Sequence, residues 1–169
     1  MSDQQGMSED ERLRAQRDES EAERADRNFA ELLQELRVIQ TGVQILVAFL
    51  LTLPFQARFA TLDSFQRGIY VTTLLLAVLA TILFTAPAAL HRQLFRKGMK
   101  RELVEASSRL AGAGMVVLAF ALTSAVLLVV DVVHGTPEAL VAAAATFLVC
   151  GVMWALVPRH LGRKASRTD

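Results

Sequence analysis

Polar side chains within long apolar stretches are the residues of this chain that could do chemistry. Arg37, Gln40, Thr41 and Gln44 lie three or four residues from one another, and this spacing places them on one face of a helix. Amides and a guanidinium that converge between helices could coordinate an ion or a polar substrate. They could also form interhelical hydrogen bonds that fix the packing, at about 0.6 kcal/mol per contact, and we favour this second role.

Asp131 is the only carboxylate within a predicted membrane span. A proton-coupled transporter needs a carboxylate that loads and releases protons, and Asp131 is the one candidate for that role. It lies near the end of its apolar stretch, where water is close. We therefore favour the alternative that Asp131 is an interfacial or hydrogen-bonded residue.

Patterns of enzymes and metal sites are missing from the sequence. It has no Gly-rich phosphate loop, no nucleophile elbow and no His/Glu metal spacing. Its three histidines, His91, His134 and His160, lie at the ends of apolar stretches on opposite predicted sides of a membrane. We expect no catalytic residues, no metal and no cofactor. A net charge of +1 gives no bulk attraction to nucleic acid.

Four apolar stretches must position these polar residues. They cover roughly 38–55, 68–86, 110–133 and 139–157. Each is close to the ~20 residues that cross a ~30 Å hydrocarbon core at ~1.5 Å per residue. The sequence therefore predicts an all-α membrane protein, with a transmembrane domain over 28–158 and four transmembrane helices in two hairpins.

The distribution of Lys and Arg predicts the orientation of these spans. Sixteen of the 18 lie in the N-terminal segment, the connection 87–109 and the tail 158–169, whereas the connection 56–67 holds only Arg58 and Arg67. The positive-inside rule then puts the N-terminus and the C-terminus in the cytoplasm. We expect a multi-pass protein of the plasma (inner) membrane.

The two ends of the chain and the helix boundaries carry local signals. Residues 1–27 are charged and nearly free of apolar side chains, so we expect a disordered cytoplasmic tail. Residues 159–169 form a basic cytoplasmic tail.

From Phe29 an apolar spacing of three and four predicts an amphipathic extension of the first helix. Asp63 and Gln66 form a capping-box pattern. Gly135 and Pro137 predict a tight turn.

Small residues mark predicted contact faces of the helices, because small-xxx-small spacing lets helices approach closely in lipid. The predicted packing positions are Thr73, Ala77, Thr81, Ala142, Thr146, Gly151 and Ala155. These positions are compatible with a compact bundle, a homo-oligomer or a larger membrane complex, and they do not distinguish between the three. A basic segment is expected to meet anionic lipid headgroups at ~1 kcal/mol per side chain, or to act only as a topology determinant. Its residues are Arg92, Arg96, Lys97, Lys100 and Arg101.

Residues 25–44, with Leu53-Pro54-Phe55, Arg58-Phe59 and the segment 63–67, resemble a family of small actinobacterial membrane proteins of unknown function. The similarity covers about residues 25–158. It implies a four-span membrane protein and carries over no catalytic residues. Some members of this family are labelled sodium:proton antiporters.

Two functions follow as expectations. The first is a non-enzymatic accessory, scaffold or envelope component, because the spans are well formed and hold few ionisable groups. The alternative is a small oligomeric cation/proton antiporter or channel, in which Gln40, Gln44 and Asp131 would act.

Overall fold

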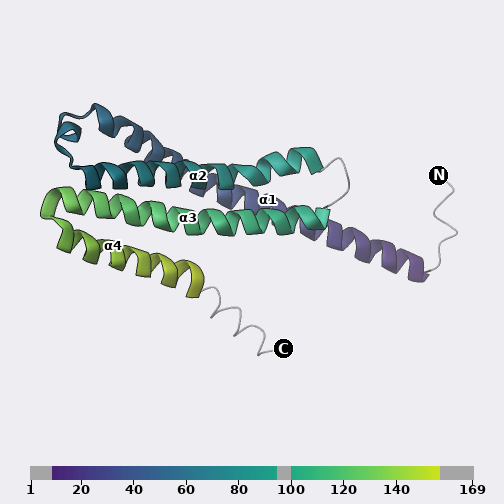
Figure 1. Ribbon diagram of the computed structural model, residues 1–169. Coiled ribbons are helices and arrows are strands. Elements are labelled where there is room, and N and C mark those ends of the chain that lie inside the picture. The colour runs from purple at the N-terminus through teal and green to yellow at the C-terminus, as the bar shows by residue number, and fades with distance from the viewer. Residues whose placement is uncertain (1–8, 95–99, 157–169) are drawn as a thin grey trace.

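The computed structural model describes residues 9–94 and 100–156, with side chains at Arg27, 30–90 and 105–156 (Figure 1). Its long helices are α1 (Glu9–Thr52), α2 (Ser64–Leu94), α3 (Lys100–His134) and α4 (Thr136–Gly151). Two 3₁₀ turns, η1 (Leu53–Phe55) and η2 (Ala57–Thr61), connect α1 to α2. A π-helical turn, η4 (Val152–Leu156), extends α4. The described chain is all-helical, as the sequence predicts.

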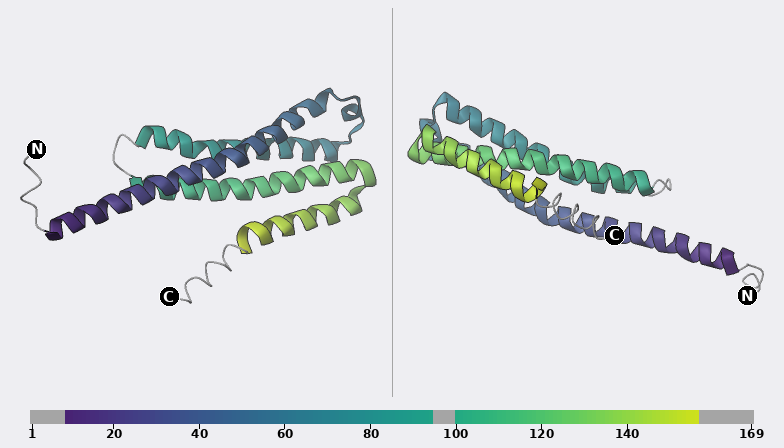
Figure 2. Two further views of the ribbon diagram at one scale, coloured as in Figure 1. Left: turned by 180° about the vertical axis from the view of Figure 1, so that it is seen from behind. Right: turned by 90° about the horizontal axis from the view of Figure 1, so that it is seen from below.

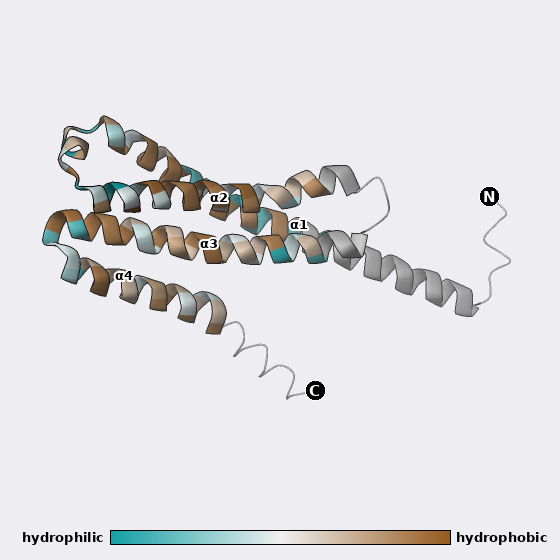
Figure 3. Ribbon diagram, viewed as in Figure 1, coloured by the Kyte–Doolittle hydropathy of each residue, from teal (hydrophilic) through white to brown (hydrophobic). Residues whose placement is uncertain are grey.

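All four long helices are long and apolar enough to cross a membrane. The candidate spans are Ala30–Phe55, Ser64–Leu90, Glu105–His134 and Thr136–Leu156, and each contains most or all of one predicted apolar stretch. Large apolar side chains such as Phe49 and Val141 point outward, and Figure 3 shows apolar residues along all four helices. An exposed apolar surface of this extent needs a lipid or protein covering. The four helices therefore indicate a multi-pass membrane protein.

The centre of the bundle is the pair α2 and α3, which lie side by side, while α1 packs mainly on α2 and α4 on α3 (Figures 1 and 2). Within the most apolar window of each span, 28% of the α2 residues are buried, against 11% in α1 and in α4. Helices α1 and α4 consequently leave most of their surface to lipid or to other proteins.

Helix α1 contributes a single ridge to this packing. Leu36, Val43 and Leu50 are buried and lie seven residues apart, so they share one face of the helix. Leu36 and Val43 meet Phe84 of α2 in one apolar cluster, and Leu50 joins Tyr70 in a second. The predicted amphipathic extension is confirmed from Leu32 onward, since Leu32 packs against the first cluster. The side chain of Phe29 is not described.

The start of α1 differs from the expectation of a disordered segment over 1–27, because the helix begins at Glu9. The charged segment continues a helix that is already formed, so it does not bear the cost of nucleation. It is also rich in Ala, Glu and Arg, which favour helix. Residues 1–8 and the predicted basic tail 159–169 lie outside the described residues.

Helix α2 runs past the predicted end of its apolar stretch at residue 86. It continues to Leu94 and contains Pro87, whose side chain is fully buried. Proline has no N–H to donate to the carbonyl four residues earlier, yet membrane helices tolerate this where neighbouring helices surround the site. The proline therefore lies within the helix instead of ending it.

The turn between α3 and α4 consists of Gly135 alone. Its φ of 106° lies in the left-handed region, which favours glycine. Its N–H donates to the carbonyl of Asp131 (3.1 Å), and its carbonyl accepts from the N–H of Ala139 (3.2 Å). The predicted tight turn is confirmed, and it brings α4 directly back along α3.

Gly114 allows α2 and α3 to approach closely. A Cβ at this position would lie 2.7 Å from Cε1 of Phe84. Phe84 is only 2% exposed, so its ring cannot easily move away. Gly112, one half-turn earlier on α3, would place a Cβ in open space. The two glycines are therefore a matched pair with opposite surroundings.

Replacing Gly114 by Ala is expected to lower the free energy of unfolding by about 1–3 kcal/mol, because the new methyl overpacks the contact with Phe84. Gly112→Ala is the control, and its effect should be neutral or a gain of up to about 1 kcal/mol from helix propensity. Denaturant unfolding of both variants in detergent micelles measures the difference. Equal stability of the two variants would contradict the proposed close contact.

Candidate functional site

The side chain of Gln66 joins the start of α2 to the end of α3. Its amide Nε2 donates to Oδ2 of Asp131 (2.8 Å). Its amide oxygen accepts from the N–H of Asp63 (3.3 Å), whose Oδ1 accepts from the N–H of Gln66 (2.8 Å). The predicted capping box is thereby confirmed. The same amide also fixes α3, because its donor and acceptor face different helices.

Asp131 lies near the end of α3 with 8% of its surface exposed. Oδ2 accepts the hydrogen bond from Gln66, whereas Oδ1 is buried and has no hydrogen-bond partner among the described residues. A buried carboxylate oxygen of this kind is a potential acceptor for a proton, a water molecule or a cation. The hydrogen bond fits the structural role that we favoured for Asp131, and proton exchange stays a prediction.

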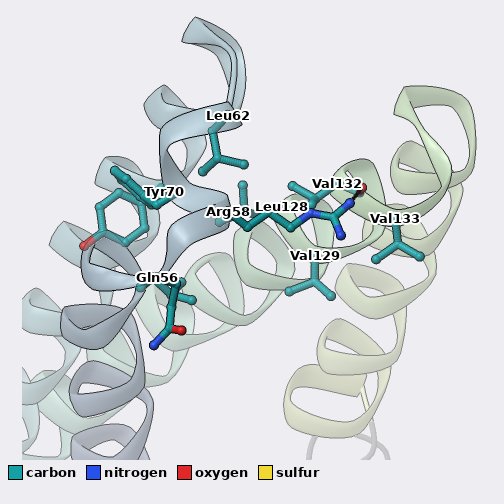
Figure 4. Close-up of a pocket in the computed structure, with 10 residues that line it drawn as sticks. Gln56, Arg58, Leu62, Tyr70, Leu128, Val129, Val132 and Val133 are labelled. Atoms are coloured by element: carbon teal, nitrogen blue, oxygen red, sulfur yellow. Dashed lines mark hydrogen bonds between the residues drawn. The ribbon is translucent and has the colours of Figure 1, made fainter.

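A groove of about 240 Å³ lies beside this cluster, between the 53–62 segment, α2 and α3. Most of its lining is apolar and includes Leu62, Leu128 and Val133. Arg58 extends from the 53–62 segment, which we call the linker, and its Nη2 donates to the carbonyl of Val132 (3.3 Å; Figure 4). Carbonyls in the last turn of a helix lack partners in the helix itself. Arg58 therefore caps α3, and the apolar walls suit a hydrocarbon group better than an ion.

Tyr70 ties α1 to the same end of the bundle. Its hydroxyl donates to the carbonyl of Leu50 (3.0 Å), and its ring meets Phe59 edge-on at 5.1 Å between centroids. We call this end, formed by Gln66, Asp131, Arg58 and Tyr70 with their partners, the linker end. Sequence reasoning assigned Gln66 only to a cap and Arg58 only to topology. The signal available was their position in a connection on the same predicted side of the membrane as Asp131.

The polar face of α1 lies away from this cluster. Arg37, Thr41 and Gln44 are exposed and Gln40 is half-buried. The hydroxyl of Thr41 donates to the carbonyl of Arg37 (2.9 Å), within its own helix. In the described part of the chain, no side-chain hydrogen bond joins this face to another helix. The structure thus does not bring these residues together with Asp131.

The predicted packing positions divide between the two helices. On α2, Thr73 and Ala77 are fully buried and Thr81 is half-buried. On α4, Ala142 and Thr146 are half-buried, and Gly151 is exposed with open space around its Cβ position. Ala155 is half-buried in the following turn η4. The residues of α4 that are buried are instead Ala139 and Ala143.

The basic residues expected to meet lipid headgroups cannot be placed. Arg96 and Lys97 lie outside the described residues, and the side chains of Arg92, Lys100 and Arg101 are not described either.

Removing the carboxylate of Asp131 is expected to weaken the linker end. Asp131→Ala should lower the free energy of unfolding by about 1–2 kcal/mol, because the amide of Gln66 loses its acceptor. Asp131→Asn keeps an acceptor oxygen and should cost less than half as much. Unfolding in detergent measures both variants, with Gln56→Ala at an exposed site of the linker as control. If Asp131→Ala were as stable as Gln56→Ala, the bond would have no structural role.

One comparison with known proteins gives a result. A model of a protein family described as a family of unknown function (DUF6328) matches residues 18–158. No curated protein and no solved structure matches the chain significantly. The family match covers all four candidate spans and the whole linker end. The four candidate spans of this chain therefore lie within the matched segment. The chain belongs to this family of unknown function.

Proposed function

We propose that the chain is a non-enzymatic accessory or scaffold protein of the plasma membrane. The observation that carries this proposal is the structural role of Asp131, the only buried carboxylate among the described side chains. It accepts a hydrogen bond that holds α2 and α3 together. A side chain that serves in this way stabilises the bundle and needs no transported ion to explain it.

Three threonines of the spans support the same role, although the hydroxyls of Ser107 and Thr123 on α3 are buried without a partner among the described residues. The hydroxyls of Thr73, Thr81 and Thr146 each donate to the carbonyl four residues earlier in their own helix. Leu128, one turn before Asp131, is buried in the second apolar cluster. An apolar side chain therefore lies next to the carboxylate on the side that faces the middle of the bundle.

The uncovered faces of α1 and α4 are where an accessory protein would act. Only 11% of the most apolar window of either span is buried within the chain. Phe49 on α1 and Val141 on α4 are 69% and 72% exposed. Two spans with this much free surface suit association with other membrane helices. That surface supports the accessory role, and the partners of the chain would meet it within the bilayer.

The proposed orientation puts both termini in the cytoplasm, as the distribution of Lys and Arg favours. In a Cys150→Ser background, Thr136→Cys should react with a membrane-impermeant maleimide added to intact cells. Thr136 is exposed in the turn region between α3 and α4. Glu31→Cys, exposed at the opposite end of the bundle, should react only after the membrane is permeabilised. Labelling of Glu31→Cys alone in intact cells would reverse the proposed threading, and labelling of both positions would contradict it.

A second candidate function is a small oligomeric cation/proton antiporter or channel. The specific observation in its favour is Oδ1 of Asp131, which is buried and lacks a hydrogen-bond partner among the described residues. A cation or proton could use this oxygen without breaking the bond from Gln66. A single chain of four spans would need further copies to form a pathway around it.

Purified protein in liposomes separates the two functions. For an accessory protein, sodium and proton flux should equal that of protein-free liposomes, with Asp131→Asn indistinguishable from the wild type. For an antiporter, wild-type flux should exceed the background and Asp131→Asn should lower it by about tenfold or more, since a neutral amide carries no proton. Wild-type flux above the background would overturn the accessory proposal. Equal flux in both proteins would remove Asp131 from any mechanism.

A further inference from the structure

We infer that α1 is the interface between two copies of this chain, held by Gln44 of each copy. The inference requires that α1 lies in the membrane, and it is independent of the accessory role proposed above. It begins from Gln44, a polar side chain that the single chain leaves exposed to hydrocarbon.

Gln44 lies near the middle of the candidate span Ala30–Phe55 and is exposed. Its amide has no hydrogen bond to any described residue. In a bilayer this places two N–H donors and a carbonyl in hydrocarbon, where unsatisfied polar groups are strongly disfavoured. Arg37 does not share this difficulty, because it lies about 10 Å nearer the end of the span and its long side chain reaches toward the headgroups.

The position of Gln44 around the helix turns its side chain away from the buried ridge of α1. Val43 lies in the buried ridge of α1, and Gln44 follows it by about 100° around the axis. Gln44 therefore flanks the ridge and is exposed. The polar side chains of the other spans with recorded hydrogen bonds, such as Thr81 and Asp131, bond within the chain elsewhere.

A second copy of this chain fits the requirement better than another class of partner. The positive-inside rule orients every copy in the same way, so a second α1 presents its own Gln44 at the same depth. An amide carries both donors and an acceptor, so two such groups related by a two-fold axis satisfy each other. This is the isologous contact that most soluble homodimers also use.

The neighbours of Gln44 on this face leave room for the contact. Ala48 lies one turn further along α1 and Thr41 about one turn earlier, and both are exposed. The hydroxyl of Thr41 is already bonded to the carbonyl of Arg37, so it adds no unsatisfied group. Small side chains on either side of Gln44 let two helices approach closely enough for the amides to meet.

Disulfide formation in membranes tests this interface with Gln44 intact. In a Cys150→Ser background, Ala48→Cys places a thiol on the proposed face. Phe49→Cys is the matched control, because Phe49 is 69% exposed in the same span and lies about 100° further around the axis. Mild oxidation should yield a covalent dimer from Ala48→Cys, in at least about tenfold excess over Phe49→Cys, since a disulfide needs Cα atoms within about 7 Å.

Gln44→Leu added to Ala48→Cys then tests the amide itself. The dimer fraction should fall by about tenfold at low protein density, the size expected for a strong interhelical hydrogen-bonded pair in lipid. Gln44→Asn, which keeps an amide, should retain part of the dimer. Because Gln44 is exposed in the single chain, Gln44→Leu should leave unfolding in detergent unchanged.

Four results would overturn the inference. They are equal cross-linking at positions 48 and 49, an unchanged dimer fraction in Gln44→Leu, cross-linking of Ala48→Cys only to a different protein, and a loss of stability in Gln44→Leu that would place the amide inside the single chain.

Discussion

Hydrocarbon offers no hydrogen bonds, and this constraint governs the arrangement of the polar groups in the described bundle. The helices satisfy their own backbones. The hydroxyls of Thr73 and Thr146 return to carbonyls of their own helices. The carbonyl of Val132, in the last turn of α3, receives a donor from Arg58 of the linker. At each of these places the chain supplies from within itself what water would supply to a soluble protein.

Close packing of α2 against α3 reflects a second property of lipid, since lipid tails give no hydrophobic drive for two helices to associate. Contact area must replace that drive, and the pair achieves it where Phe84 lies directly over Gly114. Gln66 and Asp131 then join the two helices near the linker end. The hydroxyl of Tyr70 on α2 also donates to the carbonyl of Leu50 on α1, whereas among the described residues no side-chain hydrogen bond joins α4 to another helix. The association of α4 with the centre therefore depends on apolar packing and on its turn from α3.

Sequence reasoning succeeded where the signal was local. The capping box of Asp63 and Gln66 and the turn at Gly135 depend on residues a few positions apart, and both are present. The four apolar stretches also follow from composition alone. The bond between Gln66 and Asp131 was not predicted, because 65 residues separate the partners and only the packing of α2 on α3 brings them together.

The buried face of α4 shows a second limit. Its residues 142–145 are all alanine, so the pattern contains little difference between faces. The small-residue spacing therefore favoured Ala142 and Gly151, whereas the structure buries Ala139 and Ala143. Helix α1 carried a clearer signal, since its ridge through Leu36 and Val43 is flanked by charged residues before the membrane. Asymmetry along a helix face, more than overall hydropathy, made the packing predictable.

Gln44 and Asp131 pose the same physical problem and reach different solutions. Asp131 lies at the end of a span, where the linker folds back and brings the amide of Gln66 within 2.8 Å. Gln44 lies mid-span, where helices pass without turns and no connection can deliver a donor. A polar group at that depth must find its partner on a parallel helix. No described side chain of α2, α3 or α4 hydrogen-bonds to Gln44, which is why we infer a partner from a second copy of the chain. The polar face of α1 holds the residues that the sequence analysis considered first as a site for chemistry. Because Gln44 lacks a partner within the chain, this face is better explained as a surface for association.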